Sequence, residues 1–262
     1  MNNRHLFEGK TVLDVGCGTG VLSIFAAKAG AAKVYGVDCA DIAFKAREIV
    51  IENGLADKVT IIKGLVENID LPVHKVDIII SEWMGYFLLY ESMLDSVIVA
   101  RDRWLKRGGL MFPDKCTLYL AGIEDTEYRE NKIDFWDNIH GVSMQSIKRL
   151  ALKEPIIDIV EPQQLATTAC PIFKANIQTV KLHQTEFVSS YILKAERTDY
   201  IHAVIAWFDV EFTHGSEKLT LTTDPRGEYT HWRHSVFYIE KPIPLKADET
   251  IRGSIAMRKN DI

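Results

Sequence analysis

The first 112 residues alternate short apolar runs with stretches of helical periodicity, and this alternation limits the possible folds more than any other feature of the chain. The apolar runs predict strands at residues 11–15, 33–37, 59–62, 76–80 and 110–112. The periodic stretches predict helices between them, at residues 19–29, 41–53 and 91–105. Strands that alternate with helices form parallel sheets through βαβ units. We therefore expect an α/β fold with a Rossmann-like parallel sheet in this part.

The pattern changes after Pro113 and Asp114. Apolar residues then recur at every second position, as at residues 117–120 and 203–212, and this period predicts antiparallel strands of a barrel or sandwich. A helical stretch at about residues 126–153 interrupts these strands. The sequence thus predicts two domains, a Rossmann-like domain at residues 1–114 and a β-barrel-like domain at residues 115–262.

A glycine-rich turn with the sequence DVGCGTG, residues 14–20, ends the first predicted strand. Gly16 and Gly18 lack side chains, so a ligand can approach the backbone closely there. The spacing differs from GxGxxG, in which a pyrophosphate rests on a helix N-terminus, and an acid, Asp14, comes first. A carboxylate repels phosphate but accepts hydrogen bonds from an ammonium group, such as the one in S-adenosylmethionine. Taken alone, the turn also fits a tight connection without a ligand.

Two further acids follow the next two strands. Asp38 ends the second strand, where a carboxylate can accept hydrogen bonds from both ribose hydroxyls of a nucleotide. Glu67, next to Val66, follows the third strand and can accept from an exocyclic adenine amine, although a lone acid there is more often solvated. Ligands of open α/β sheets bind across the carboxyl ends of the strands. The three acids together therefore predict a cofactor site more strongly than any one of them.

The fourth predicted strand leads directly into residues 81–91, SEWMGYFLLYE, which we call the two-glutamate loop. Its two carboxylates, Glu82 and Glu91, bracket four aromatic residues. These are Trp83, Tyr86, Phe87 and Tyr90. A planar guanidinium suits such a site because it offers five donors in a fork and stacks on rings. Two carboxylates would also draw its charge toward one terminal nitrogen and leave the other more nucleophilic.

The composition of this loop also fits two other interpretations. An acidic surface hairpin with an aromatic core face would have the same composition. Paired carboxylates also serve glycoside hydrolysis, but that chemistry leaves the glycine-rich turn unexplained. The position of the loop, straight after a predicted strand of the parallel sheet, favours the guanidinium site.

Composition argues against several classes of protein. The chain has no apolar run near the ~20 residues of a membrane-spanning helix, and its first residues lack the apolar core of a secretory signal. We therefore expect a cytoplasmic or nuclear protein without membrane contact. A formal net charge of -5 disfavours nucleic acid as a direct partner. The four cysteines show no metal-ligand spacing, so we expect neither a metal site nor disulfides.

With these motifs in place, the chain resembles the type I protein arginine N-methyltransferases of eukaryotes over nearly its whole length. The matching segments are NRHLF at residues 3–7, VLDVGCGTG at 12–20, SEWMGYFLLYESML at 81–94, LKEP at 152–155, THW at 230–232 and VFY at 236–238. The resemblance implies a class I methyltransferase fold and S-adenosylmethionine as cofactor. It also implies methylation of arginine in proteins such as histones and Arg/Gly-rich RNA-binding proteins. The helical stretch at about residues 126–153 would be a dimerisation arm, so a homodimer is implied.

The resemblance also assigns roles to individual residues. Glu82 and Glu91 would bind the guanidinium. The cofactor pocket would be lined by Asp14, Gly16, Gly18, Asp38, Val66, Glu67 and Met93, the last of which would crowd the methyl-accepting nitrogen. His231 of the THW motif would lie at the domain interface and help take up the proton lost after transfer. Without the resemblance, a lone histidine in a sheet is more often structural.

The chain departs from the family in two respects. Asp38 stands where the family has glutamate, one methylene longer, so we expect an altered cofactor affinity. The chain also begins just before NRHLF and ends at Ile262, which implies that the family's cofactor-covering helices and last barrel strands are missing. An alternative is therefore a catalytically weak or idle chain that acts as a dimerising or regulatory partner. A small-molecule methyltransferase is disfavoured because the two-glutamate loop suits a guanidinium.

Overall fold

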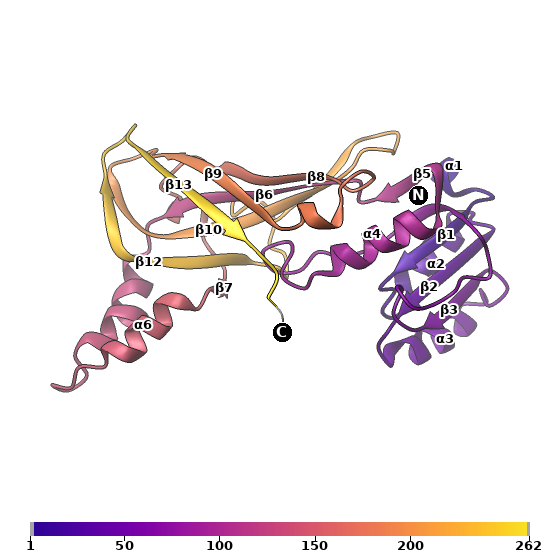
Figure 1. Cartoon of the computed structure of the whole chain (residues 1–262), viewed down its shortest axis with the longest axis horizontal. Helices are drawn as coiled ribbons and strands as arrows, with labels where there is room; N and C mark the ends of the chain where they lie inside the picture. Colours follow the sequence, from indigo (N-terminus) through magenta and orange to yellow (C-terminus); the bar gives the residue numbers. More distant parts are fainter. Residues whose placement is uncertain (1–2, 261–262) are drawn as a thin grey trace.

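The computed structural model describes residues 3–260, which form an α/β part and an antiparallel β part that lie side by side (Figure 1). The α/β part is built on a parallel sheet with the strand order β3-β2-β1-β4-β5. Its strands are β1 (Thr11–Val15), β2 (Lys33–Asp38), β3 (Val59–Lys63), β4 (Val76–Ile80) and β5 (Leu105–Phe112). Because β1 lies between β2 and β4, the segments that follow these three strands meet at one edge of the sheet.

Helices cover both faces of this sheet. A short helix, α1 (Arg4–Phe7), precedes β1, and the longer ones are α2 (Val21–Lys28), α3 (Ile42–Glu52) and α4 (Met93–Trp104). Leu13 and Ile79 pack in the cluster that contains the apolar side of α4. Val12 and Ile78 point the other way, into the cluster formed with α2 and α3. The central strands are therefore apolar on both faces, as a parallel sheet between two helical layers requires.

One strand of the sheet is longer than the sequence predicted. β5 begins at Leu105, directly after α4, instead of at residue 110. Gly108 and Gly109 lie inside this strand, and its register with β4 shifts between Val76 and Ile78. An edge strand needs a partner on one side only, so it accommodates glycines and a register shift that a central strand would not.

The second part of the chain is antiparallel. The larger sheet has the order β7-β12-β10-β6-β8, with β11 paired to β10, and a separate pair joins β13 to β9. The strands are β6 (Lys115–Ile123), β7 (Ile156–Asp158), β8 (Cys170–Asn176), β9 (Phe187–Lys194), β10 (Asp199–Phe212), β11 (Leu219–Thr222), β12 (His234–Leu245) and β13 (Thr250–Met257). Two single 3-10 turns, η3 (Pro162–Gln164) and η4 (Leu182–Gln184), lie between them. The predicted fold class, a Rossmann-like sheet followed by a β-barrel-like part, is confirmed.

A single hydrophobic cluster runs through both parts, from Leu13 in β1 to Phe208 in β10. The type of sheet changes between β5 and β6, next to the predicted boundary at residue 114. Because the core is shared across this point, the division into two domains stays a prediction. Among the described residues, no helix is both long and apolar enough to span a membrane.

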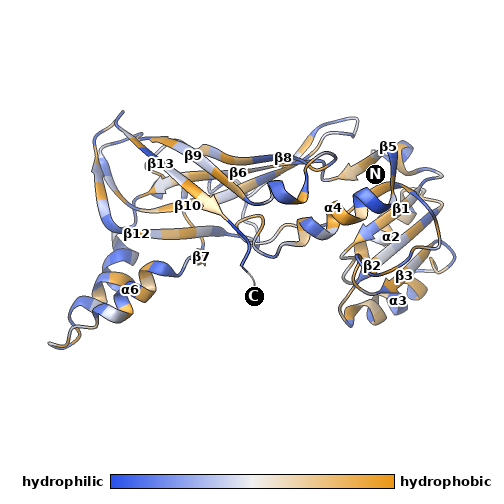
Figure 2. Cartoon of the chain, viewed as in Figure 1, coloured by the Kyte–Doolittle hydropathy of each residue, from blue (hydrophilic) through white to orange (hydrophobic). Residues whose placement is uncertain are grey.

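A helical arm projects from the end of the β part that lies away from the α/β part (Figure 1). It consists of four short pieces, α5 (Thr126–Tyr128), the π-helical η1 (Arg129–Ile133), the 3-10 helix η2 (Asp134–Asp137) and α6 (Gln145–Lys153). In Figure 2, α6 shows both hydrophilic and hydrophobic residues. Ile147 and Leu150 on this helix are exposed to solvent.

Candidate active site

The glycine-rich turn after β1 depends on backbone conformations that glycine adopts easily. Gly16, Gly18 and Gly20 have φ angles of 70°, 53° and 84°, in the left-handed region. A Cβ atom on Gly16 would lie 2.1 Å from the terminal methyl carbon of Met93. A Cβ on Gly18 would meet no atom within 4 Å. The missing side chain at Gly16 therefore lets the start of α4 contact the turn, whereas Gly18 faces open space.

Asp14, the last residue but one of β1, is fully buried. Its Oδ2 accepts a hydrogen bond of 2.7 Å from the Ser23 hydroxyl, and its Oδ1 is buried without a hydrogen-bond partner among residues 3–260. Burial raises the pKa of this carboxyl from 3.8 to about 6, although the Ser23 hydrogen bond opposes the shift. A buried carboxylate oxygen without a partner fits a cationic group of a ligand, such as an ammonium.

Asp38 lies at the end of β2 and holds the turn in place. Its Oδ2 accepts a 2.8 Å hydrogen bond from the Gly18 amide, and its Oδ1 accepts one of 2.9 Å from the Ala40 amide. Each carboxylate oxygen can accept more than one hydrogen bond, so the side chain can still bind ribose hydroxyls. The sequence predicted the ligand role and missed this structural one.

The third predicted acid approaches the same region from β3. Val66 is buried, whereas Glu67 is exposed and accepts a short hydrogen bond from the Ser96 hydroxyl in the first turn of α4. Met93 and Ser96 thus link the start of α4 to two of the predicted cofactor residues, Gly16 and Glu67. Together these contacts place the predicted cofactor residues around the carboxyl edge of the sheet.

The two-glutamate loop lies between β4 and α4, next to this turn. The Ser81 hydroxyl, buried at its start, donates a 2.8 Å hydrogen bond to the Val15 carbonyl at the end of β1. Glu82 and Glu91 are both exposed. Partial burial raises the pKa of Glu82, the Met84 amide opposes this, and the negative charge of Glu91 raises it further. The charge of Glu91 therefore acts on the Glu82 carboxyl.

The aromatic residues of the loop have two different roles. Trp83 is only 2% exposed and belongs to the hydrophobic core, and Phe87 packs edge-on against Phe237 with ring centroids 5.5 Å apart. Tyr86 and Tyr90 are 39% and 76% exposed. The four aromatic residues that the carboxylates bracket are therefore not all available for stacking on a guanidinium. Trp83 is buried because its large apolar ring fills the core below the loop, and only the two tyrosines remain free to meet a ligand.

The THW motif reaches the two-glutamate loop from the β part. Trp232 is buried, and its indole Nε1 donates a 2.7 Å hydrogen bond to the carbonyl of Met84. His231 is exposed, with its ring centroid 3.9 Å from that of Trp232. Sequence reasoning assigned a role to His231 and missed Trp232, although the two residues are adjacent in one motif. An apolar cavity of about 680 Å3 opens beside this contact, and Glu82 and Trp232 are among its lining residues.

Comparison with known proteins identifies the family. Residues 114–262 match the family model described as arginine methyltransferase oligomerization subdomain, and residues 3–99 match the model of ribosomal protein L11 methyltransferase. Protein arginine N-methyltransferase 1 of Chlamydomonas reinhardtii is 54% identical over 260 residues, which are 99% of this chain and 75% of that protein. The chain belongs to the protein arginine methyltransferase family. The methyltransferase 1 of Schizosaccharomyces pombe is 50% identical over 98% of this chain and 76% of its own length.

Solved structures of arginine methyltransferases also resemble the structure of this chain. A Trypanosoma brucei structure, described as an arginine methyltransferase 1 enzyme-prozyme heterotetrameric complex with AdoHcy, has a TM-score of 0.96 and 47% identity. The match covers 99% of this chain and 82% of that one. Arginine methyltransferase 10 of Arabidopsis thaliana matches with a TM-score of 0.84 and 36% identity over 96% of this chain and 80% of its own. The predictions of a protein arginine N-methyltransferase and of S-adenosylmethionine as its cofactor are confirmed, and the arm lies within an oligomerization subdomain.

Proposed function

We propose that this enzyme methylates arginine in histone tails and Arg/Gly-rich RNA-binding proteins, and that Glu82 and Glu91 bind the substrate guanidinium. The observation that carries the proposal is the placement of two exposed carboxylates on one loop, between β4 and α4. The Ser81 hydroxyl ties this loop to the end of β1, and Met93, two residues after Glu91, contacts the glycine-rich turn. A cationic side chain bound by the loop therefore lies next to the turn.

The two carboxylates would act on the guanidinium by position and charge. Each can accept N–H donors from the fork, which holds the positive charge toward one terminal nitrogen and leaves electron density on the other. The arriving cation favours ionised carboxylates, so it lowers the raised pKa of Glu82. S-adenosylmethionine, when bound, supplies an electrophilic methyl group on a sulfonium. We assign to His231, exposed beside Trp232, the uptake of the proton that the nitrogen loses.

The cofactor would be held by residues from three strand ends and from α4. The unpartnered oxygen of Asp14 suits the ammonium group, and Asp38 suits the ribose hydroxyls. Glu67 beside buried Val66 suits the adenine amine, while Gly16 and Gly18 leave room for close approach. Met93 fills the space above Gly16, so it would bound the pocket on the side of the methyl group.

Methyl transfer from labelled S-adenosylmethionine to an Arg/Gly-rich peptide tests the proposal. We expect Glu91→Gln to lose most of the activity, because it removes one of the two charges that hold the guanidinium. Glu8→Gln is the matched control, since Glu8 is also exposed but lies between α1 and β1. Equal activity of Glu91→Gln and Glu8→Gln would contradict the assigned role.

We also propose that the enzyme assembles as a homodimer and works in the cytoplasm or nucleus. The oligomerization subdomain supports assembly, and the Trypanosoma brucei relative forms a heterotetramer of enzyme and prozyme. No observation favours the alternative of an idle partner chain, because the predicted cofactor residues are grouped around one sheet edge. Calorimetric titration with S-adenosylmethionine separates the two, since an idle chain would show no binding heat.

A further inference from the structure

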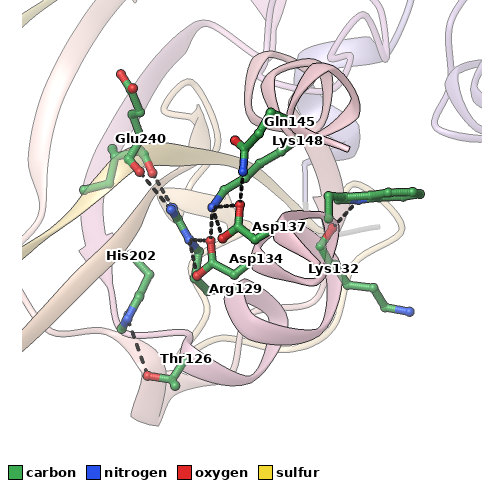
Figure 3. Close-up of polar contacts among 11 residues, drawn as sticks. Thr126, Arg129, Lys132, Asp134, Asp137, Gln145, Lys148, His202 and Glu240 are labelled. Carbon is green, nitrogen blue, oxygen red and sulfur yellow. Dashed lines mark hydrogen bonds and ion pairs between the residues drawn. The ribbon is translucent and has the colours of Figure 1, made fainter. Parts of the chain in front are cut away.

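A buried arginine ties the helical arm to the β part. Arg129, in the π-helical piece η1, is only 5% exposed. Its Nη1 and Nη2 donate hydrogen bonds of 2.5 and 2.8 Å to the carbonyls of Ile239 and Glu240 on β12, and its Nε lies 3.0 and 3.1 Å from the two oxygens of Asp134 (Figure 3). A single guanidinium thus joins the strand to the next piece of the arm, η2.

A second cation continues this network into α6. The Nζ of Lys148 lies 2.7 Å from Asp134 Oδ1 and 2.7 Å from Asp137 Oδ2 (Figure 3). Gln145, one turn earlier on the same helix, donates a 2.5 Å hydrogen bond to Asp137. The side chain of Lys148 is 16% exposed, so these pairs are partly shielded from water. Such charge-assisted hydrogen bonds are stronger than exposed surface pairs.

The ionisation of these groups agrees with their geometry. Burial alone would raise the pKa of Asp134, but hydrogen bonds from Lys148 and Arg129 outweigh it and lower the pKa. Burial alone would lower the pKa of Lys148, but its bonds to the two aspartates raise it. Each group is therefore held in its charged form around neutral pH.

The pieces of the arm are too short to keep their arrangement alone. α5, η1 and η2 contain three, five and four residues, and α6 contains nine. Isolated helices of this length are not stable in water, so contacts between the pieces must fix their relative angles. Apart from the Arg129 network, the base of the arm is held where Tyr238 donates to Asp125 and stacks on Tyr128 at 4.8 Å.

The network also determines what the arm presents to a partner. Its charged groups Asp134, Asp137 and Lys148 are turned toward one another. The apolar side chains that remain outside are Phe135, Val142, Ile147 and Leu150, each between 40% and 54% exposed. Several exposed apolar side chains on one short insertion indicate a contact surface. The shape of this surface depends on the angle between η2 and α6.

We propose that Arg129, Asp134 and Lys148 form a lock that holds the arm in the conformation that binds a second copy of this chain. The three are positioning residues, which affect methyl transfer only through assembly. This inference rests on the homodimer proposed above.

The test compares Lys148→Met with Lys132→Met. Both changes remove one lysine charge from the arm, but Lys132 is exposed and its side chain points away from the network (Figure 3). We expect Lys148→Met to weaken self-association roughly 10-fold or more, as loss of partly buried charged hydrogen bonds does. Lys132→Met should leave it unchanged, and Lys148→Arg, which keeps the charge, should restore most of it. Sedimentation over a range of concentrations measures all four proteins.

Two further measurements separate positioning from general stability. Methyl transfer by Lys148→Met should recover as enzyme concentration rises, because mass action restores the dimer. Backbone amides of residues 134–150 should exchange faster in this variant, while amides of β10 keep the wild-type rate. If Lys148→Met unfolds globally, Asp134→Asn replaces it, since that side chain pairs with both Arg129 and Lys148, is 36% exposed and keeps its size in the variant.

Two results would overturn the lock. One is equal self-association of Lys148→Met and Lys132→Met, and the other is equal amide exchange in their arms. A wild-type protein that stays monomeric at every concentration would refute the homodimer and, with it, the role of the lock in binding a second copy. Amide exchange would then still report whether the network fixes the arm, so failure of the lock and failure of the homodimer are distinguishable.

Discussion

The glycine-rich turn and the two-glutamate loop follow adjacent strands, β1 and β4, and both contain left-handed backbone. The turn places Gly16, Gly18 and Gly20 at these positions, where glycine is unstrained. The loop places Phe87 and Leu88 at φ angles of 51° and 61°, and Ser92, directly after the loop, has a φ of 55°. Such a conformation costs a non-glycine residue roughly 1–2 kcal/mol.

This difference shows how each segment is held. Asp38 and the glycines form the turn through contacts close to the end of the sheet. The loop keeps its strained shape because Leu88 and Trp83 are buried in the core and Trp232 binds the Met84 carbonyl. The cofactor side therefore depends on local sequence, whereas the substrate side depends on packing from both parts of the chain.

The largest expected effect separates the chemistry of the two segments. Glu82→Gln should reduce kcat about 10²–10³-fold, the usual cost of removing one preorganised electrostatic group, and leave cofactor affinity unchanged. Asp14→Asn should weaken cofactor binding, because the ammonium loses its charged partner. Methyl-transfer kinetics and calorimetric titration of both variants check this. Equal loss of cofactor affinity in the two would show that the segments do not act separately.

The second largest expected effect is a pH dependence of the free energy of unfolding, which arises from Asp14 in the glycine-rich turn. The folded state raises the pKa of Asp14 from 3.8 to about 6, so it binds this proton more tightly than the unfolded state does. The stability contributed by Asp14 is therefore fully present below pH 3.8 and is lost as the pH rises to about 6, by at most ~3 kcal/mol. Unfolding free energies at pH 4.5 and 7 should change less with pH in Asp14→Asn than in the wild type. A cofactor ammonium favours the ionised form, so cofactor affinity should rise over the same range.

A glycine pair tests the contact between the turn and α4. Gly16→Ala should destabilise the protein by about 2 kcal/mol or more, because it adds both a left-handed alanine and an overlap with Met93. Gly18→Ala has only the backbone cost, about 1 kcal/mol. Urea denaturation measures both, and Met93→Ala added to Gly16→Ala should recover part of the loss. Equal destabilisation by the two alanines would mean that Met93 simply moves aside.

The sequence predicted the turn better than the loop because the turn depends on local sequence, whereas the loop depends on packing from both parts of the chain. β1 and β4 lie where their apolar runs predicted them, Asp14 begins the glycine-rich turn, and Asp38 at the end of β2 accepts a hydrogen bond from it. Nothing in the loop distinguishes Trp83 from the exposed tyrosines, because its burial depends on a core that the loop shares with the β part. The hydrogen bond from Trp232 to Met84 joins residues 148 positions apart, a distance over which no local pattern gives information.

The smallest expected effect tests whether backbone strain at the end of the loop serves function. Ser92, between Glu91 and Met93, precedes α4 in a left-handed conformation and makes no side-chain cap hydrogen bond. Ser92→Gly should relieve the strain and stabilise the protein by about 0.5 kcal/mol, after allowing for the greater freedom of glycine in the unfolded chain. It should also lower kcat, because Glu91 loses a fixed neighbour. Thermal unfolding and methyl-transfer kinetics measure the two effects.

Asp248→Gly is the matched control for this substitution. Asp248 has a φ of 71° in the turn between β12 and β13, and its ion pair with Lys194 is exposed and contributes little to stability. The Asp248→Gly variant should gain similar stability, and its kcat should not change. If Ser92→Gly also keeps full activity, the left-handed residues of the loop are a by-product of packing, and the contrast with the glycine-rich turn has no functional meaning. If only Ser92→Gly loses activity, the strain holds Glu91 in the geometry that binds the guanidinium.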